Sequence, residues 1–177
     1  MDLPNVFVVD SANLSTGHGL LVLAAAEAAE RGNSPECVLR MLEGAAPRVE
    51  TSFVLNRLDY MRKGGRCSSV AALGANLLKL HPCIEVVGGK ISVTRKYRGS
   101  MEKVVSDYIH DRLDHRTDLD KRRAFLVNTA TPELLDIARE ELRNCGVFDE
   151  IIETKAGCTV FCHCGPNTLG VMFLRSK

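Results

Sequence analysis

The side chains best suited to chemistry lie in the stretch from Ala156 to Gly170. This stretch falls between two predicted strands and contains Gly157, Gly165, Pro166 and one imidazole, that of His163. Glycine permits positive φ and close approach of the backbone, and proline stiffens a turn. Because a histidine held on such a turn can bind a polar group near neutral pH, we predict that His163 is a ligand-binding residue.

The same stretch offers metal or thiol chemistry as an alternative, through Cys158, Cys162, His163 and Cys164. Zinc sites usually combine two ligand pairs that are well separated in sequence, whereas these four residues crowd together. In an extended segment, neighbouring side chains would also point to opposite faces. We therefore expect structural thiols and no metal here. Nothing in the sequence marks the oxyanion hole or orienting acid that Cys–His catalysis needs.

A second candidate segment, Lys63 to Arg66, lies far upstream and contains two glycines before the arginine. It is no phosphate loop, because it lacks the GxxxxGK[ST] spacing and its glycines end a predicted helix. The arginine is either a solvated surface charge or a ligand-binding group, and the residues alone leave both open.

Composition limits the function classes. The chain has 177 residues, 45% hydrophobic and 25% charged, which is typical of a globular protein with a core. A net charge of +1 argues against a nucleic-acid or membrane surface driven by bulk charge. The run Leu20–Ala26 is too short to span a bilayer, and no signal peptide is visible, so we expect a cytoplasmic protein. Seven cysteines without a regular framework indicate mostly buried thiols in a reducing compartment.

The first 47 residues are predicted to form a strand and two helices. Val6–Val9 is apolar on both faces, like a strand in the middle of a parallel sheet. A helix follows from Leu20 to Arg31, and a second begins at Ser34-Pro35-Glu36 and ends at Gly44. A doubly covered strand needs neighbours on both sides, and none precedes it here. We therefore interpret residues 1–47 as the end of an N-terminal α/β domain.

The remaining residues, 48–177, are predicted to form a second α/β unit with a mixed sheet. A helix over Ser69–Leu80 is rich in small residues, which allow another backbone or a thin ligand to approach. The other predicted elements are a strand at Val49–Leu55, a short helix capped by Asn56, a hairpin of Ile84–Val87 and Lys90–Thr94, helices at Met101–Ile109 and Thr131–Cys145, and strands at Phe125–Val127, Ile151–Thr154 and Leu169–Leu174.

With these residues in place, the sequence resembles the DegV family of bacterial fatty-acid-binding proteins. The matching segments occur in family order over nearly the whole chain: Val9–Ser11 with Gly17–Val22, Leu58–Arg66, Leu78–Pro82, Arg95–Ser100 and His163–Gly170. One such motif would be weak evidence, but five in register are specific. Family members are longer two-domain proteins. The resemblance therefore implies a DegV-like fold comprising the end of the N-terminal domain, residues 1–47, and the whole C-terminal domain, residues 48–177.

The resemblance implies a carrier that binds one long-chain fatty acid and presents its carboxylate to a partner fatty-acid kinase. Such a protein is no enzyme and needs no cofactor besides the bound lipid. The implied carboxylate-binding residues are Arg66, His163 and Asn167. The implied pocket-lining residues are Gly65, Ala72, Leu73, Leu77 and Gly165. A buried carboxylate is costly unless it is hydrogen-bonded or paired, and arginine or histidine does both.

Two other classes stay open at this point. One is a metal- or thiol-dependent protein that uses the four Cys and His residues of the stretch 158–164, and the other is an interaction domain without a ligand. If the front half of the family fold is missing, an apolar face should be exposed and favour self-association.

Overall fold

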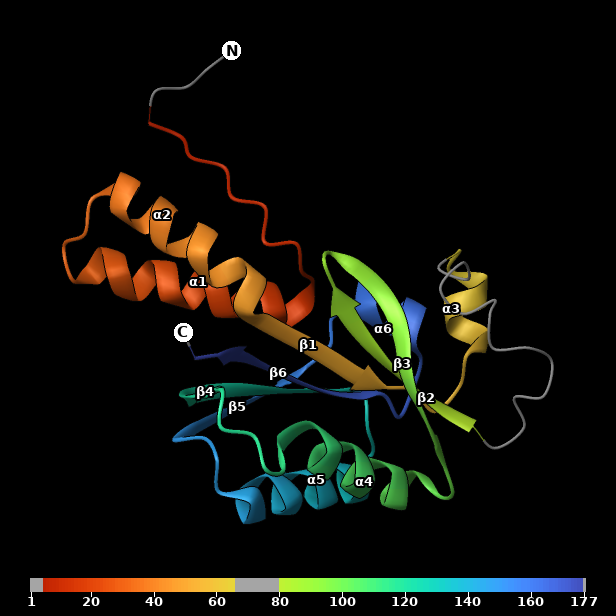
Figure 1. Ribbon diagram of the computed structural model, residues 1–177. Coiled ribbons are helices and arrows are strands. Elements are labelled where there is room, and N and C mark those ends of the chain that lie inside the picture. Colours follow the sequence, from red (N-terminus) through yellow and green to blue (C-terminus); the bar gives the residue numbers. More distant parts are fainter. Residues whose placement is uncertain (1–4, 66–79, 177) are drawn as a thin grey trace.

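The computed structural model describes residues 5–65 and 80–176, which build one six-stranded sheet with helices on both faces (Figure 1). The strand order is β3-β2-β1-β6-β4-β5, and every neighbouring pair is antiparallel except β4 and β5, which are parallel. The predicted mixed α/β sheet is therefore confirmed. In chain order the elements are α1 Ser15–Glu30, α2 Pro35–Ala45, η1 Ala46–Arg48, β1 Val49–Val54, α3 Asp59–Lys63, β2 Leu80–Val87, β3 Lys90–Arg98, α4 Met101–Leu113, β4 Leu119–Asn128, α5 Pro132–Cys145, β5 Glu150–Lys155, α6 Cys158–Cys164 and β6 Leu169–Arg175.

Different helix pairs cover the two faces of the sheet. Successive residues of a strand point to opposite faces, so neighbours on one strand pack with different helices. On β6, Met172 and Leu174 pack with residues of α1 and α2. Their neighbours Val171 and Phe173 pack with residues of α4 and α5. Figure 1 shows α1 and α2 on one side of the sheet and α4 and α5 on the other.

A third apolar cluster joins the short helices α3 and α6 to the sheet. It contains Phe53, Leu58, Met61, Ile84 and Cys164, all of them buried. Burial of these side chains compensates for the low intrinsic stability of helices of five and seven residues.

The capping signals place the longer helices as predicted. Ser34 Oγ accepts a hydrogen bond from Cys37 N at 3.3 Å at the start of α2, and Thr131 Oγ1 accepts one from Leu134 N at 3.5 Å at the start of α5. Gly146 ends α5 in the left-handed conformation, with φ of 60°. The predicted β2–β3 hairpin is also confirmed, although both strands are longer than expected.

Three local predictions are wrong. The helix α1 begins at Ser15, more than a turn before Leu20. Its first turn packs against β1 at Gly17, where an ideal Cβ would lie 2.0 Å from Thr51 Oγ1. Asn56 does not cap α3, whose N-cap position is Leu58 without a side-chain hydrogen bond. The segment 158–164, predicted to be part of a glycine-rich turn, is the helix α6.

The predicted strand Val6–Val9 is not formed. Its side chains are largely exposed, 58% for Val6 and 87% for Val8, and no strand in the described part of the chain pairs with it. An apolar segment without neighbouring strands cannot complete a ladder, so it stays irregular. Together with α1 and α2 it borders an apolar groove of ≈ 460 Å³, lined among others by Phe7, Val9 and Val38.

The predicted helix Ser69–Leu80 lies outside the described residues, except that Leu80 begins β2. None of the described helices is long and apolar enough to cross a membrane. The division of the chain at residues 47 and 48 stays a prediction. In the structure, α1 and α2 share one apolar cluster with β1, β4 and β6.

Candidate functional site

His163 lies on α6 with its ring directly against Gly64, the residue that ends α3. An ideal Cβ at Gly64 would lie 2.0 Å from His163 Nδ1 and 2.7 Å from Cε1, so the ring occupies the space of the missing side chain. Gly64 has φ of −79°, which any residue adopts, so this glycine is required by the close contact and not by its backbone conformation.

The Nδ1 atom of His163 is buried and has no hydrogen-bond partner within residues 5–65 and 80–176. A buried polar atom without a partner costs about 1–3 kcal/mol. Such an atom is a ready donor or acceptor for the polar end of a ligand, which makes this ring the centre of the site.

The turn that follows α6 is held firmly by Thr129, the residue just beyond the end of β4. Its Oγ1 donates to Gly165 O at 2.7 Å and accepts from Thr168 N at 3.0 Å, and its backbone oxygen accepts from Asn167 N at 3.1 Å. A further bond, from Thr168 Oγ1 to Cys164 O at 2.9 Å, ties the turn to the last turn of α6. The segment that carries His163 is thus fixed to the end of the central strands.

Gly165 and Asn167 both adopt positive φ, at 75° and 57°. At Gly165 a side chain is also excluded by space, because an ideal Cβ would lie 2.4 Å from the ring of Tyr60. Asparagine tolerates the left-handed region better than most residues, so the turn itself gives a reason for Asn167. Its side chain is half-buried.

A small apolar cavity of ≈ 30 Å³ lies between α6, the start of α1 and the sheet. It has room for about one to two water-sized groups, far less than an acyl chain needs. Residues that line it are Leu14, Phe53, Val127, Val160, Cys164 and Met172.

The structure therefore brings together part of the predicted site. His163, Gly165 and Asn167 lie on one helix end and turn, and the segment of Gly64 and Gly65 reaches this ring from α3. Gly65 is exposed, with φ of 71°. The other predicted residues, Arg66, Ala72, Leu73 and Leu77, lie outside the described residues.

The sequence prediction missed two residues of the site, Thr129 and Tyr60. Their contacts with the turn span many residues of sequence, 36 between Thr129 and Gly165. The only signal for Thr129 was its position two residues after the predicted strand Phe125–Val127, where polar groups often serve a site.

The cysteines of α6 do not support the metal alternative. In the described part of the chain, Cys158, Cys162, His163 and Cys164 form no group of three donors close enough to share an ion. Cys158 and Cys162 are exposed, against the prediction of mostly buried thiols, because they lie on the outer side of the helix. Cys164 is buried, and burial raises the pKa of its thiol to about 11, so this thiol is unreactive.

Comparisons with known proteins agree with this fold. A family model described as an uncharacterised protein of the DegV family matches residues 2–176. A DegV domain-containing protein of Clostridium acetobutylicum is 32% identical over 176 residues, covering 98% of this chain and 61% of the relative. A protein of Thermotoga maritima named fatty acid-binding protein is 31% identical, covering 96% of this chain and 59% of its own length.

A solved structure described as fatty acid binding of a DegV family protein from Thermus thermophilus superimposes with a TM-score of 0.82 at 27% identity. The match covers 96% of this chain and 60% of that structure, so the chain spans about three fifths of the length of such relatives. The family model and these relatives show that the chain belongs to the DegV family.

Proposed function

We propose that this protein binds a long-chain fatty acid and receives its carboxylate at His163. The observation that carries the proposal is the buried Nδ1 atom, which lacks a partner in the described residues and is held rigidly between Gly64 and the turn after α6. The relatives from Thermotoga maritima and Thermus thermophilus, which are described as fatty-acid-binding, support the choice of ligand.

In this proposal each predicted residue has a role. His163 and Asn167 hydrogen-bond the carboxylate, and Arg66 supplies the opposite charge. Gly65 and Gly165 let the ligand come close to the backbone. Ala72, Leu73 and Leu77 form one wall of the channel for the tail, together with parts of the family fold beyond this chain.

The acyl tail and the carboxylate contribute different amounts to the binding free energy. Burying about 14 methylene groups at ~0.8 kcal/mol each contributes about 11 kcal/mol, before the cost of ordering the chain. A hydrogen bond to a charged group contributes about 1.5–3 kcal/mol. The tail therefore dominates affinity, and the polar residues fix where the carboxylate lies. This arrangement suits a carrier that presents the carboxylate to a partner fatty-acid kinase and performs no catalysis itself.

The test is to extract the purified protein with organic solvent, identify acyl chains by mass spectrometry, and titrate the delipidated protein with a fatty acid. His163→Ala and Arg66→Ala should each weaken binding roughly 10- to 100-fold without abolishing it. His115→Ala, which removes an exposed imidazole from the loop after α4, is the matched control and should bind like the wild type.

Unchanged affinity in both site variants would remove their proposed role. Absence of any acyl chain and of any titratable binding in the wild type would contradict the proposed function itself. The predicted self-association through an apolar face is checked on the same samples by light scattering, and a strictly monomeric protein would contradict it.

A further inference from the structure

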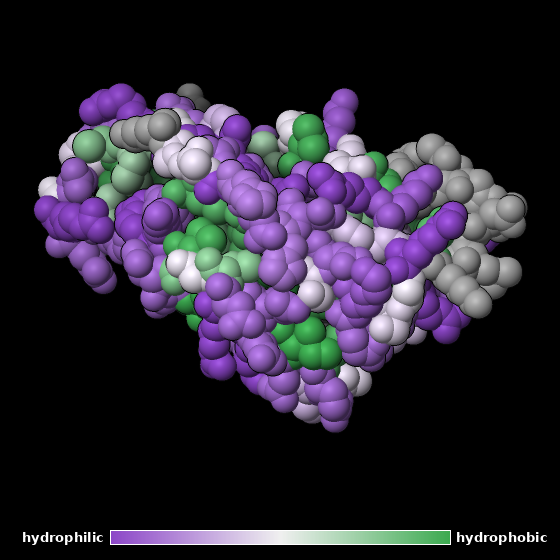
Figure 2. Space-filling view, turned by 60° about the horizontal axis from the view of Figure 1, so that its bottom comes forward, coloured by the Kyte–Doolittle hydropathy of each residue, from purple (hydrophilic) through white to green (hydrophobic). Residues whose placement is uncertain are grey.

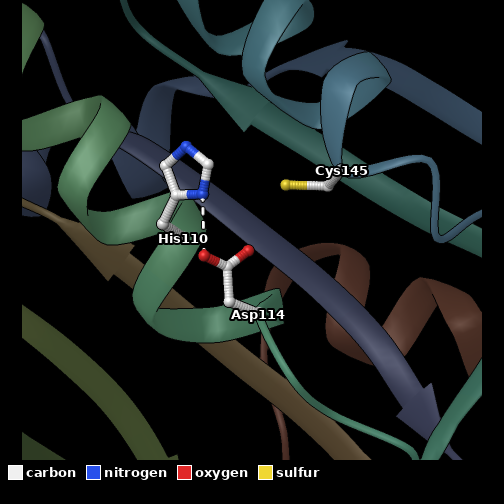
Figure 3. Close-up of side chains that lie close together, drawn as sticks. All are labelled: His110, Asp114 and Cys145. Carbon is white, nitrogen blue, oxygen red and sulfur yellow. Dashed lines mark hydrogen bonds and ion pairs between the residues drawn. The ribbon is translucent and has the colours of Figure 1, made fainter.

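A second group of chemically active side chains lies on the opposite side of the sheet, where α4 and α5 end. His110 and Asp114 come from α4, and Cys145 is the last residue of α5. One ligand atom from each lies within 4.8 Å of the others, and His110 Nδ1 is 3.0 Å from Asp114 Oδ2. Figure 3 shows the imidazole, the carboxylate and the sulfur directed toward one another.

The helices explain why these three residues meet. His110 and Asp114 are four residues apart, so they lie on one face of α4. Glu141 of α5 contacts Ser106 and His110 of α4, and Cys145, one turn later, lies beside His110 and Asp114. The two helices therefore run in the same direction, and their C-terminal ends lie side by side. A helix C-terminus carries a partial negative charge, and two of them together favour a cation at this position.

The histidine is already oriented for coordination. Its Nε2 atom is 3.2 Å from Glu141 Oε2, and Ser106 Oγ donates to the other oxygen of the same carboxylate. A carboxylate that accepts from one ring nitrogen leaves the lone pair of the other nitrogen for a metal, as in many carboxylate–histidine–zinc arrangements. Here the other nitrogen is Nδ1, which faces Asp114 and Cys145.

We infer that His110 Nδ1, Asp114 Oδ2 and Cys145 Sγ bind a Zn²⁺ ion that joins the ends of α4 and α5. Zinc takes Cys, His and carboxylate ligands at about 2.0–2.3 Å in a tetrahedron, which places the donor atoms about 3.3–3.8 Å apart. His110 Nδ1 and Asp114 Oδ2 are 3.0 Å apart and all three donor atoms lie within 4.8 Å of one another, so small side-chain shifts bring them to that spacing.

Thiolate and imidazole ligands select zinc over Mg²⁺ and Ca²⁺, which prefer oxygen. The side chains of His110 and Asp114 are each 44% exposed, so an ion can enter from solvent and water can fill the fourth position.

The experiment is a titration of the reduced, metal-free chain with Co²⁺, which substitutes for zinc and gives a near-ultraviolet charge-transfer band when a thiolate binds it. The wild type should show the band at stoichiometric Co²⁺ and lose it on addition of Zn²⁺. Cys145→Ser should lose the band, and Asp114→Asn should weaken binding. Glu141→Gln, which removes the carboxylate charge behind His110 Nε2 and no proposed ligand, should lower affinity about 10- to 100-fold.

The matched control is the double variant Cys158→Ser, Cys162→Ser, which removes the two exposed thiols of α6 and should keep the band. Zn²⁺ should also raise the urea midpoint of the wild type and leave that of Cys145→Ser unchanged. A band that persists in Cys145→Ser, a band lost in the double variant, or a wild type that binds neither Co²⁺ nor Zn²⁺ would each overturn the assignment.

Discussion

At the scale of single residues, the ring of His163 occupies the space that a side chain at Gly64 would fill. The Nδ1 atom fills the place where a Cβ of residue 64 would be, and the turn behind the ring is held by Thr129. Gly64 and Gly65 therefore serve different purposes, although they are adjacent. Gly64 makes room for the ring, whereas Gly65 has a φ of 71° and nothing within 4 Å of an ideal Cβ.

Substitutions of the two adjacent glycines, Gly64 and Gly65, test this arrangement. Gly64→Ala should displace the ring, destabilise the protein by about 1–3 kcal/mol and weaken fatty-acid binding. Gly65→Ala should cost about 1 kcal/mol through backbone strain alone and leave the ring in place. Urea denaturation of both variants and the NMR signals of the His163 ring check this, and ring signals displaced equally in the two variants would contradict it.

Residue types alone predicted His163 as a ligand-binding residue, whereas the pocket-lining role of Gly165 followed from the family resemblance. The structure places both residues at the end of α6 and its turn, and their roles stay predictions. Tyr60 and Thr129 were not identified. Their role depends on long-range contacts with the turn, and neither residue type nor spacing reports such contacts.

At the scale of elements, helices with complete end signals were predicted well. The α5 helix has Thr131 and Pro132 at its start and Gly146 at its end, and the structure follows them. The α6 helix and the first turn of α1 were missed, since glycine and adjacent cysteines give weak local preference. There packing on the sheet decides the conformation.

The α4 helix is fixed to the centre of the sheet by the hydroxyl of Tyr108, which is fully buried. It donates to Ser52 O at 2.9 Å, accepts from Val171 N at 2.9 Å and lies 2.8 Å from Ser52 Oγ. Burial raises the pKa of this phenol well above its usual value, so it stays protonated.

Tyr108→Phe should therefore destabilise the protein by about 1–3 kcal/mol, because it leaves buried partners unsatisfied. Tyr97→Phe is the matched control: its hydroxyl donates to Asp111, a carboxylate that water also reaches, so the loss should be smaller. Urea midpoints measure both variants, and an equal or larger loss in Tyr97→Phe would contradict the explanation.

At the scale of the whole molecule, the mixed sheet was predicted from the hairpin and the alternation of strands and helices. The strand predicted at Val6–Val9 is not formed, and that prediction is wrong because an apolar run does not show whether partner strands exist. Figure 2, with the α4–α5 side brought forward, shows a largely hydrophilic surface with small apolar patches. The large exposed apolar side chains of the described part all lie outside α4 and α5: Val6, Phe7, Val8, Val22, Met41, Val87 and Phe161.

The α1 layer is tied to the sheet by an ion pair, in which Arg123 Nη1 donates to Glu27 Oε1 at 2.7 Å. The hydrogen bond from Arg123 holds the pKa of Glu27 below its ordinary value. A carboxylate with a lowered folded pKa stabilises the protein above its ordinary pKa and loses this contribution as the pH falls through the folded pKa.

The free energy of unfolding should therefore fall more steeply between about pH 5 and about pH 3 in the wild type than in Glu27→Gln. The difference should stay below about 1 kcal/mol, since the side chain of Glu27 is 31% exposed and solvent screens the pair. Urea denaturation across this range is the measurement, with Glu30→Gln as the control on the same helix. Parallel pH profiles for the wild type and Glu27→Gln would contradict the role of the pair.

The order of the strands has a consequence for folding during translation. Its two middle strands, β1 and β6, pair from Val49 with Leu174 to Val54 with Leu169, so one is synthesised early and the other late. During translation the hairpin of β2 and β3 and the parallel pair of β4 and β5 can form before β6 is made. A nascent chain that lacks β6 cannot join these two parts into one sheet. The sheet is therefore completed in one late step. A stop codon shortly before Leu169 would leave the strands β3-β2-β1 and β4-β5 without the strand that pairs with both β1 and β4.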